Sequence, residues 1–134
     1  MAETEPMYLL NRKRINLAKI YIKLINLNKL PVIPPQTNKN ATHVYQTFSV
    51  LVNSKIRTNL LNFLNKNQIG ASVHFTPPVH LQKFYKTFKS SKNNLKKTEY
   101  LSKSIISLPL YPSMKNRDVE YIINKLKEYF KKNG

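Results

Sequence analysis

Two of the three histidines in this 134-residue chain stand close together, in the stretch ASVHFTPPVHLQKFY at residues 71–85. His74 lies at the end of a strand-like run, two prolines follow it, and His80 begins the next segment. A pair of histidines could bind a metal, act in acid–base catalysis, or contact a substrate from a loop. It could equally belong to a turn with no chemical role.

The other residues that such chemistry needs are scarce. The chain has no cysteine, which excludes thiol catalysis, disulfides and cysteine-bound zinc within it. Glu99 is the only acidic residue between Pro6 and Arg117. Too few carboxylates are therefore available for a metal site, a Ser–His–acid triad or a pair of catalytic carboxylates. No lysine lies in an evidently buried apolar stretch, as a Schiff-base lysine should. We therefore expect no metal site and nominate no catalytic residue.

The net charge is +17, from 23 Lys and Arg residues against 6 Asp and Glu residues. Such a charge attracts polyanions, and in HLQKFYKTFKSSKNNLKK it alternates with the aromatic residues on which bases can stack. The basic residues are mainly lysines spread along the chain, however, whereas nucleic-acid binders usually cluster arginines. A basic nucleic-acid or polyanion-binding module is therefore the alternative function, and nucleic acid is not the favoured partner.

The start of the chain, MAETEP, is acidic, and no apolar segment follows it, so we expect no secretory signal peptide. The apolar runs are far shorter than the roughly 20 residues that span a bilayer. We expect a cytoplasmic protein without a membrane span. A chain of this length is typical of one domain with its own core.

The elements that position the histidines can be predicted from the spacing of apolar residues. Helices are expected over residues 12–28, 54–70, 80–88 and 116–132, strands over 43–52 and 71–75, and a helix that passes into a strand over 95–108. This order predicts an α+β fold, with a small, mainly antiparallel sheet and helices packed on one side of it.

Two details of these elements can be checked against the structure. In the expected strand over 43–52, alternate residues form an apolar face, and His43, Tyr45 and Ser49 fall on the opposite face. That second face could contact a ligand or simply face solvent. Ser54 is the expected N-cap of the helix that follows.

Four segments together resemble one family of enzymes. In chain order they are RKRINLAKIYIKLI, HVYQTFSVLV, IRTNLLNFLNKNQIGASVHFTPPVHLQKFY, and SLPLYPSM followed by DVEYIINKLKEYF. They resemble the C-terminal small domain of the DegT/DnrJ/EryC1/StrS sugar aminotransferases, which are pyridoxal-phosphate enzymes of the aspartate-aminotransferase fold, or fold type I. The resemblance implies an N-terminal extension over 1–11 and an aminotransferase small domain over 12–132. It also implies amino-group transfer to a keto-sugar nucleotide, in polysaccharide or amino-sugar biosynthesis.

The resemblance assigns a role to the histidines as well. In the family, the Val-His-Phe strand end and the Pro–His turn lie at the mouth of the active site. His74, Phe75 and His80 are therefore predicted to bind the nucleotide-sugar or to lie at the domain interface, with His43 and Tyr45 lining the same face. Packing of the turn is the alternative role for all five.

The large domain of the family has no counterpart in this sequence. In the family, that domain carries the lysine that binds pyridoxal phosphate, the aspartate that pairs with the pyridine nitrogen, and the groups that hold the phosphate. We therefore expect no catalytic residue here and no cofactor bound by this chain alone, with pyridoxal phosphate bound by the complete enzyme. The implied partners are a large-domain chain or a homodimer. Alone, the chain is expected to be an inactive, truncated or split enzyme.

Overall fold

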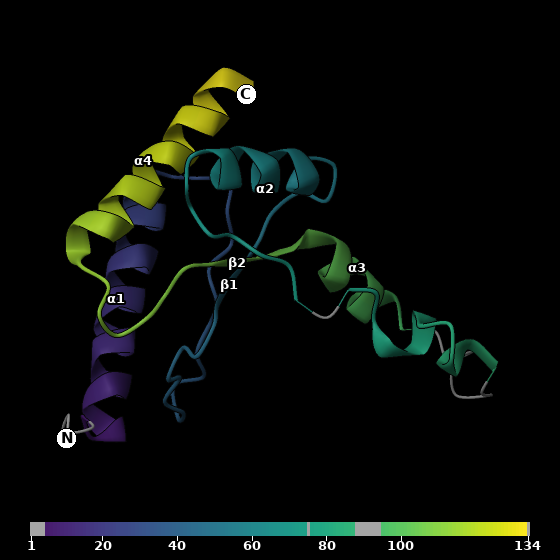
Figure 1. The fold of residues 1–134 in the computed structure, drawn as a ribbon, viewed down its shortest axis with the longest axis horizontal. Helices are drawn as coiled ribbons and strands as arrows, with labels where there is room; N and C mark the ends of the chain where they lie inside the picture. The colour runs from purple at the N-terminus through teal and green to yellow at the C-terminus, as the bar shows by residue number, and fades with distance from the viewer. Residues whose placement is uncertain (1–4, 75, 88–94, 134) are drawn as a thin grey trace.

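A computed structural model describes residues 5–74, 76–87 and 95–133 of the chain (Figure 1). The elements, in order, are α1 (Met7–Leu27), β1 (Phe48–Leu51), α2 (Arg57–Lys66), the 3₁₀ turns η1 (Val79–Leu81) and η2 (Tyr85–Thr87), α3 (Lys96–Ser104), β2 (Ile105–Leu108) and α4 (Asn116–Asn133). The predicted α+β class is confirmed.

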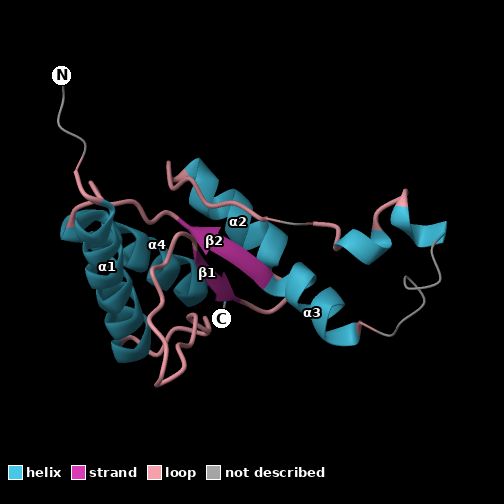
Figure 2. Ribbon diagram, turned by 90° about the horizontal axis from the view of Figure 1, so that it is seen from below, coloured by secondary structure: helices cyan, strands magenta, loops and turns pink. Residues whose placement is uncertain are grey.

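The sheet is small and antiparallel, as predicted. β1 and β2 pair along their length, and single antiparallel bridges join Ile33 to Leu51 at one edge and Ser72 to Ser107 at the other. Figure 1 shows α2 and α4 on one side of the strands, and the view from below in Figure 2 shows no helix in front of the strands. One sheet face is therefore covered by helices and the other is not.

The core lies between the covered face and the helices. Phe48 of β1 is fully buried, and its ring stacks on that of Tyr21 from α1, with centroids 4.6 Å apart. Burial of a side chain of this size contributes about 1.5–3 kcal/mol. The helical spacing of apolar residues predicts one apolar stripe on each of the two long helices, and these stripes are confirmed, although two of their predicted members, Leu24 and Phe130, are only partly buried. The buried residues of these helices are Leu17, Ala18, Tyr21, Ile25, Val119, Ile122, Ile123, Leu126 and Tyr129.

Helix α1 begins at Met7 rather than at residue 12. The carbonyl of Pro6 accepts hydrogen bonds from the amides of Leu9 (3.0 Å) and Leu10 (3.3 Å), which starts the helix ahead of its charged segment. The predicted extension over 1–11 therefore includes the first turns of α1. The domain boundary itself stays a prediction.

Both predicted strands were too long. β1 is four residues long because Tyr45 has a left-handed backbone with φ of 51°, which breaks the alternation before the strand. Tyr45 is consequently buried and Val44 is 43% exposed, the reverse of the expected faces. Of the strand predicted over 71–75, the described residues 71–74 form only the bridge at Ser72. Two prolines follow it, and proline cannot donate to a sheet ladder.

Two helix predictions also need correction. Ser54 is not the N-cap of α2; Ile56 holds that position without a side-chain hydrogen bond. The reason is local, since the side chain of Asn53 accepts a hydrogen bond from the amide of Lys55 (2.9 Å) and forms a turn there. The helix predicted over 80–88 consists of η1 and η2 as far as the chain is described. The helix that passes into a strand is confirmed as α3 and β2.

Residues 76–87 and 95–104, which we call the arm, extend away from the other elements, which we call the body (Figures 1 and 2). The arm contains η1, η2 and α3. It joins the sheet at both ends, after Ser72 and before Ile105. None of the described helices combines the length and the apolarity needed to cross a bilayer.

Candidate functional site

His74 lies where the chain leaves the sheet edge for the arm. Two backbone hydrogen bonds hold Ser72 against Ser107, with N–O distances of 3.0 and 2.8 Å. The side chain of Ser72 in turn lies 3.1 Å from Nε2 of His74. The exposed imidazole is therefore oriented from a fixed point on the sheet.

His80 lies in η1 and pairs with the acidic residue that is isolated in the sequence. Its Nε2 lies 3.1 Å from Oε1 of Glu99, with side-chain exposures of 10% and 37%. Glu99 belongs to the first turn of α3, so this contact ties η1 to α3. Sequence reasoning did not find this pair, although the lone carboxylate in a basic stretch was a signal that could have pointed to it.

A second contact ties the same turn to α3. Oγ1 of Thr76 donates to the carbonyl of Ser102 (3.4 Å), and Nη1 of Arg57 donates to the same oxygen (3.1 Å). Glu99 and Ser102 are three residues apart and therefore share one face of the helix. The turn that contains His80 thus lies along one face of α3.

His43 and Tyr45 form a separate group ahead of β1. The amide of Tyr45 donates to Nδ1 of His43 (2.8 Å), and the two rings stack at 4.1 Å. Since Nδ1 accepts, a neutral imidazole here carries its proton on Nε2. The Tyr45 hydroxyl lies 3.1 Å from Oγ1 of Thr37, and its ring lies 6.1 Å from that of Phe48. Tyr45 therefore belongs to the core, whereas His43 is exposed.

The structure thus orients four of the five predicted residues by contacts within the chain, and Phe75 lies outside the described residues. His43 contacts Tyr45, His74 contacts Ser72, and His80 contacts Glu99. Their role in substrate binding stays a prediction. Across the described part of the chain, no three His, Asp or Glu side chains gather to hold a metal ion.

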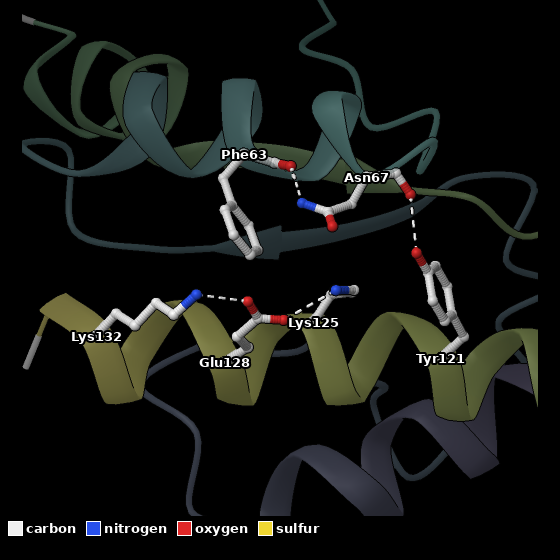
Figure 3. Close-up of polar contacts among 6 residues, drawn as sticks. All are labelled: Phe63, Asn67, Tyr121, Lys125, Glu128 and Lys132. Atoms are coloured by element: carbon white, nitrogen blue, oxygen red, sulfur yellow. Dashed lines mark hydrogen bonds and ion pairs between the residues drawn. The ribbon is translucent and has the colours of Figure 1, made fainter.

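The groups with a shifted pKa have other roles. Burial raises the pKa of Tyr21, whose hydroxyl donates to the carbonyl of Pro109 (2.8 Å) inside the body. On α4, hydrogen bonds from Lys132 (2.7 Å) and Lys125 (2.9 Å) lower the pKa of Glu128 to about 2 (Figure 3). The first shift reflects the core and the second a surface ion pair, so neither marks a reactive group beside the histidines.

The comparisons with known proteins agree with one another on the family. The model of the DegT/DnrJ/EryC1/StrS aminotransferase family matches residues 5–127. An uncharacterized protein of Methanocaldococcus jannaschii is 35% identical over 130 residues, which are 93% of this chain and 33% of that protein. The dTDP-3-amino-3,6-dideoxy-alpha-D-galactopyranose transaminase of Aneurinibacillus thermoaerophilus is 28% identical, over 89% of this chain and 31% of that enzyme.

The fold is also shared with solved structures. The crystal structure of NtdA from Bacillus subtilis with bound cofactor PMP superimposes with a TM-score of 0.74 and 27% identity. The similarity covers 89% of this chain and 29% of NtdA. The chain spans 26–33% of the length of the curated relatives that it matches. The family model, by contrast, covers nearly the whole chain, and the chain therefore belongs to the DegT/DnrJ/EryC1/StrS aminotransferase family.

Proposed function

We propose that this chain is the C-terminal small domain of a nucleotide-sugar aminotransferase that depends on pyridoxal phosphate. In this proposal the complete enzyme transfers an amino group to a keto-sugar nucleotide, in polysaccharide or amino-sugar biosynthesis. The proposal rests on the difference between the share of this chain that the family model matches and the share of each relative that this chain matches. The family model matches residues 5–127, whereas the chain accounts for only 26–33% of its curated relatives.

The described side chains do not fit pyridoxal phosphate. A lysine that forms a Schiff base must be desolvated so that its amine is neutral and nucleophilic. Every lysine whose side chain the structure describes is exposed, except Lys125, which is half-buried and bound to Glu128. We infer that the cofactor belongs to a large domain that this chain complements, and we assign no step of the reaction on the cofactor to residues of this chain.

The contribution of this chain is then to bind and orient the substrate. His74 and His80 are the candidates, because Ser72 and Glu99 orient their rings. An imidazole can donate a hydrogen bond to a diphosphate oxygen or a sugar hydroxyl. The contacts of the turn with α3 limit its movement, which lowers the entropic cost of binding.

The arm also favours a protein partner. Val79, Phe84 and Tyr100 are 60%, 72% and 56% exposed, although large apolar side chains are usually covered. In the complete enzyme we expect the large domain, or the second subunit of a homodimer, to cover part of this surface. The expected location of that enzyme is the cytoplasm.

Complementation tests the proposal. The chain would be mixed with the Aneurinibacillus transaminase truncated to remove the part that this chain matches, together with pyridoxal phosphate, a dTDP-keto-sugar and a mixture of amino-acid donors. We expect amino-sugar formation only when both proteins are present, because each alone lacks half of the site. Borohydride treatment should trap no specifically labelled lysine in this chain. A single trapped lysine in the isolated chain, or no activity from any large-domain partner, would count against the proposal.

A further inference from the structure

A pocket of about 530 Å³ lies at the end of β2 that is remote from the arm. A volume of this size is typical of sites for small molecules. Three parts of the body line the pocket: the segment after α2, the loop between β2 and α4, and the first turns of α4 (Figure 1). We call it the tyrosine pocket, and its lining consists of residues 68–70, Pro109, Tyr111, Met114, Asp118, Tyr121 and Ile122.

Hydrogen bonds within the body fix the walls of the tyrosine pocket. The hydroxyl of Tyr121 donates to the carbonyl of Asn67 (3.1 Å) and so joins α4 to the end of α2 (Figure 3). The carbonyl of Pro109 accepts a hydrogen bond from the buried hydroxyl of Tyr21 (2.8 Å), which joins the loop after β2 to α1. A pocket whose walls are already fixed costs less entropy to fill than one that must be ordered by its ligand.

The tyrosine pocket combines an apolar floor with an aromatic rim. Ile69, Met114 and Ile122 are buried, with exposures of 3%, 7% and 4%, and form the floor. Tyr111 and Tyr121 are 49% and 46% exposed and form the rim. The floor suits the apolar body of a ligand, and the face of a tyrosine ring attracts a cation.

Asp118 gives the pocket its charge. Among the described residues that line the pocket, Asp118 alone is charged at neutral pH. The amide of Lys115 donates to Oδ2 of Asp118 (2.8 Å), whereas Oδ1 has no hydrogen-bond partner within the described part of the chain. Asp118 lies in the first turn of α4, where the helix dipole favours an ionised carboxylate. Oδ1 is therefore a negatively charged acceptor, held in place and open to a ligand.

Lys125 shows that the same kinds of group already hold an ammonium group next to the pocket. Its Nζ lies 5.9 Å from the centroid of the Tyr121 ring and 2.9 Å from Oε2 of Glu128. A tyrosine ring and a carboxylate thus share one cation on α4. The tyrosine pocket offers a second such combination, in which Asp118 takes the place of Glu128.

The charges of the chain narrow the class of ligand. None of the described lining residues is cationic, so a phosphate or carboxylate group would meet Asp118 without a partner. The whole chain carries a charge of +17, so long-range electrostatics repel a cation, and an ammonium group that binds must be held by local contacts. The pocket therefore matches an amine and does not match a nucleotide.

We propose that the tyrosine pocket binds a small molecule that carries a primary ammonium group on an apolar body. The ammonium group donates to Oδ1 of Asp118 and lies against the rings of Tyr111 and Tyr121, while the apolar body rests on the floor. This inference goes beyond the proposed function, because none of the lining residues belongs to the candidate site of the histidines. The result of the complementation experiment therefore neither supports nor removes it.

The test uses the full chain labelled with ¹⁵N, titrated at pH 7 with phenethylamine and with phenethyl alcohol. The two probes differ only in whether an ammonium group or a hydroxyl ends the molecule. We expect the amine to shift the amides of Gly70, Tyr111, Asp118 and Tyr121 and to bind about tenfold more tightly than the alcohol, because hydrogen bonds between charged groups are the stronger ones. Equal affinities for the two probes, or no shift of these amides with the amine, overturn the proposal.

Variants of the chain separate the pocket from the overall charge. Asp118→Asn keeps an oxygen that can accept from the amide of Lys115 but removes the negative charge, and should weaken phenethylamine binding about tenfold without changing the affinity for the alcohol. Glu120→Gln is the matched control, because it removes the same charge from an exposed position of α4 outside the pocket, and should leave both affinities unchanged.

A second variant keeps the proposal testable if Asp118→Asn does not fold. Tyr111→Leu removes an exposed ring from the rim and should weaken the binding of the amine several-fold, since leucine has no π face for a cation. Circular dichroism would establish that each variant is folded. Unchanged affinity for phenethylamine in a folded Asp118→Asn or Tyr111→Leu variant overturns the proposal, as does an equal loss in Glu120→Gln.

Discussion

The body and the arm are stabilised in different ways. In the body, α1, α2 and α4 bury large apolar side chains against one sheet face, with Tyr21, Phe48 and Leu64 almost fully inaccessible. In the arm, Phe84 is 72% exposed, and the described contacts with α3 are polar ones, such as His80 with Glu99. The difference indicates that burial sets the shape of the body, whereas the described contacts between the turn and α3 are hydrogen bonds. His74 lies where these two regions meet, and His80 lies within the arm.

The largest expected effect comes from one substitution made in both regions. Phe48→Ala removes a fully buried ring that stacks on Tyr21, and should lower the free energy of unfolding by about 3–5 kcal/mol. Phe84→Ala is the matched change in the arm, where the exposed ring should contribute no more than about 0.5 kcal/mol. Urea unfolding monitored by circular dichroism measures both. Similar losses for the two variants would mean that the arm is part of the same core, and would remove the distinction.

A smaller effect is expected from the ion pair of the arm. Glu99→Ala removes the acceptor of His80, and with it a contact between η1 and α3. Because the pair is partly exposed and lies away from the core, we expect the global free energy of unfolding to fall by less than about 1 kcal/mol. Local opening of η1 should respond more strongly than global unfolding does. Amide exchange at Leu81 and Gln82, whose amides hold the 3₁₀ turn, should accelerate several-fold.

Glu99→Gln is the control for this prediction. The amide oxygen of glutamine can still accept a hydrogen bond from Nε2 of His80, although the charge is lost. We expect its exchange rates to lie between those of the wild type and of Glu99→Ala. If Glu99→Ala leaves exchange in η1 unchanged, the contact does not hold the arm and the turn must be positioned by other residues.

The two regions also differ in how far the sequence predicts them. The spacing of apolar residues predicts the buried stripe of α4 correctly. Val119, Ile122 and Leu126 recur at helical spacing along an uninterrupted helix, and burial depends on that spacing. In the arm, residues 80–88 have the composition of a helix, but among the described residues of this range Phe84 and Tyr85 are exposed, so helical spacing does not bury an apolar stripe there. Local preference alone was not sufficient there, and two 3₁₀ turns form instead.

The contacts of the candidate site residues could be predicted only in part, for related reasons. Two histidines close together in the sequence drew attention to the turn that contains His74 and His80, but the contact of His80 depends on Glu99, a residue far away in sequence. Alternation placed Ser49 correctly on the face away from Phe48. It placed Tyr45 wrongly, because a left-handed residue reverses the faces, and a non-glycine residue gives no warning of that conformation.

The smallest expected effect tests whether polar contacts also matter in the body. Hydrogen bonds from Lys132 and Lys125 lower the pKa of Glu128 from 4.5 to about 2, so folding favours its ionised form. A lowered pKa stabilises the folded state fully above about pH 4.5, and this contribution is lost as the pH falls toward 2. Glu128→Gln should therefore be less stable than the wild type at pH 7 and equal to it near pH 2. The side chain is open to solvent, which keeps the difference small.

Glu120→Gln separates the ion pair from the net charge. Glu120 is exposed on the same helix, and within the described part of the chain it makes no ion pair, so its removal raises the net charge equally without breaking such a contact. Urea unfolding of both variants at pH 7, 4 and 2 should show an excess loss for Glu128→Gln that shrinks with falling pH. Equal losses at pH 7 would mean that only net charge matters. A loss that persists at pH 2 would mean that the Glu128 side chain stabilises the body by packing on the surface of its own helix rather than by its charge.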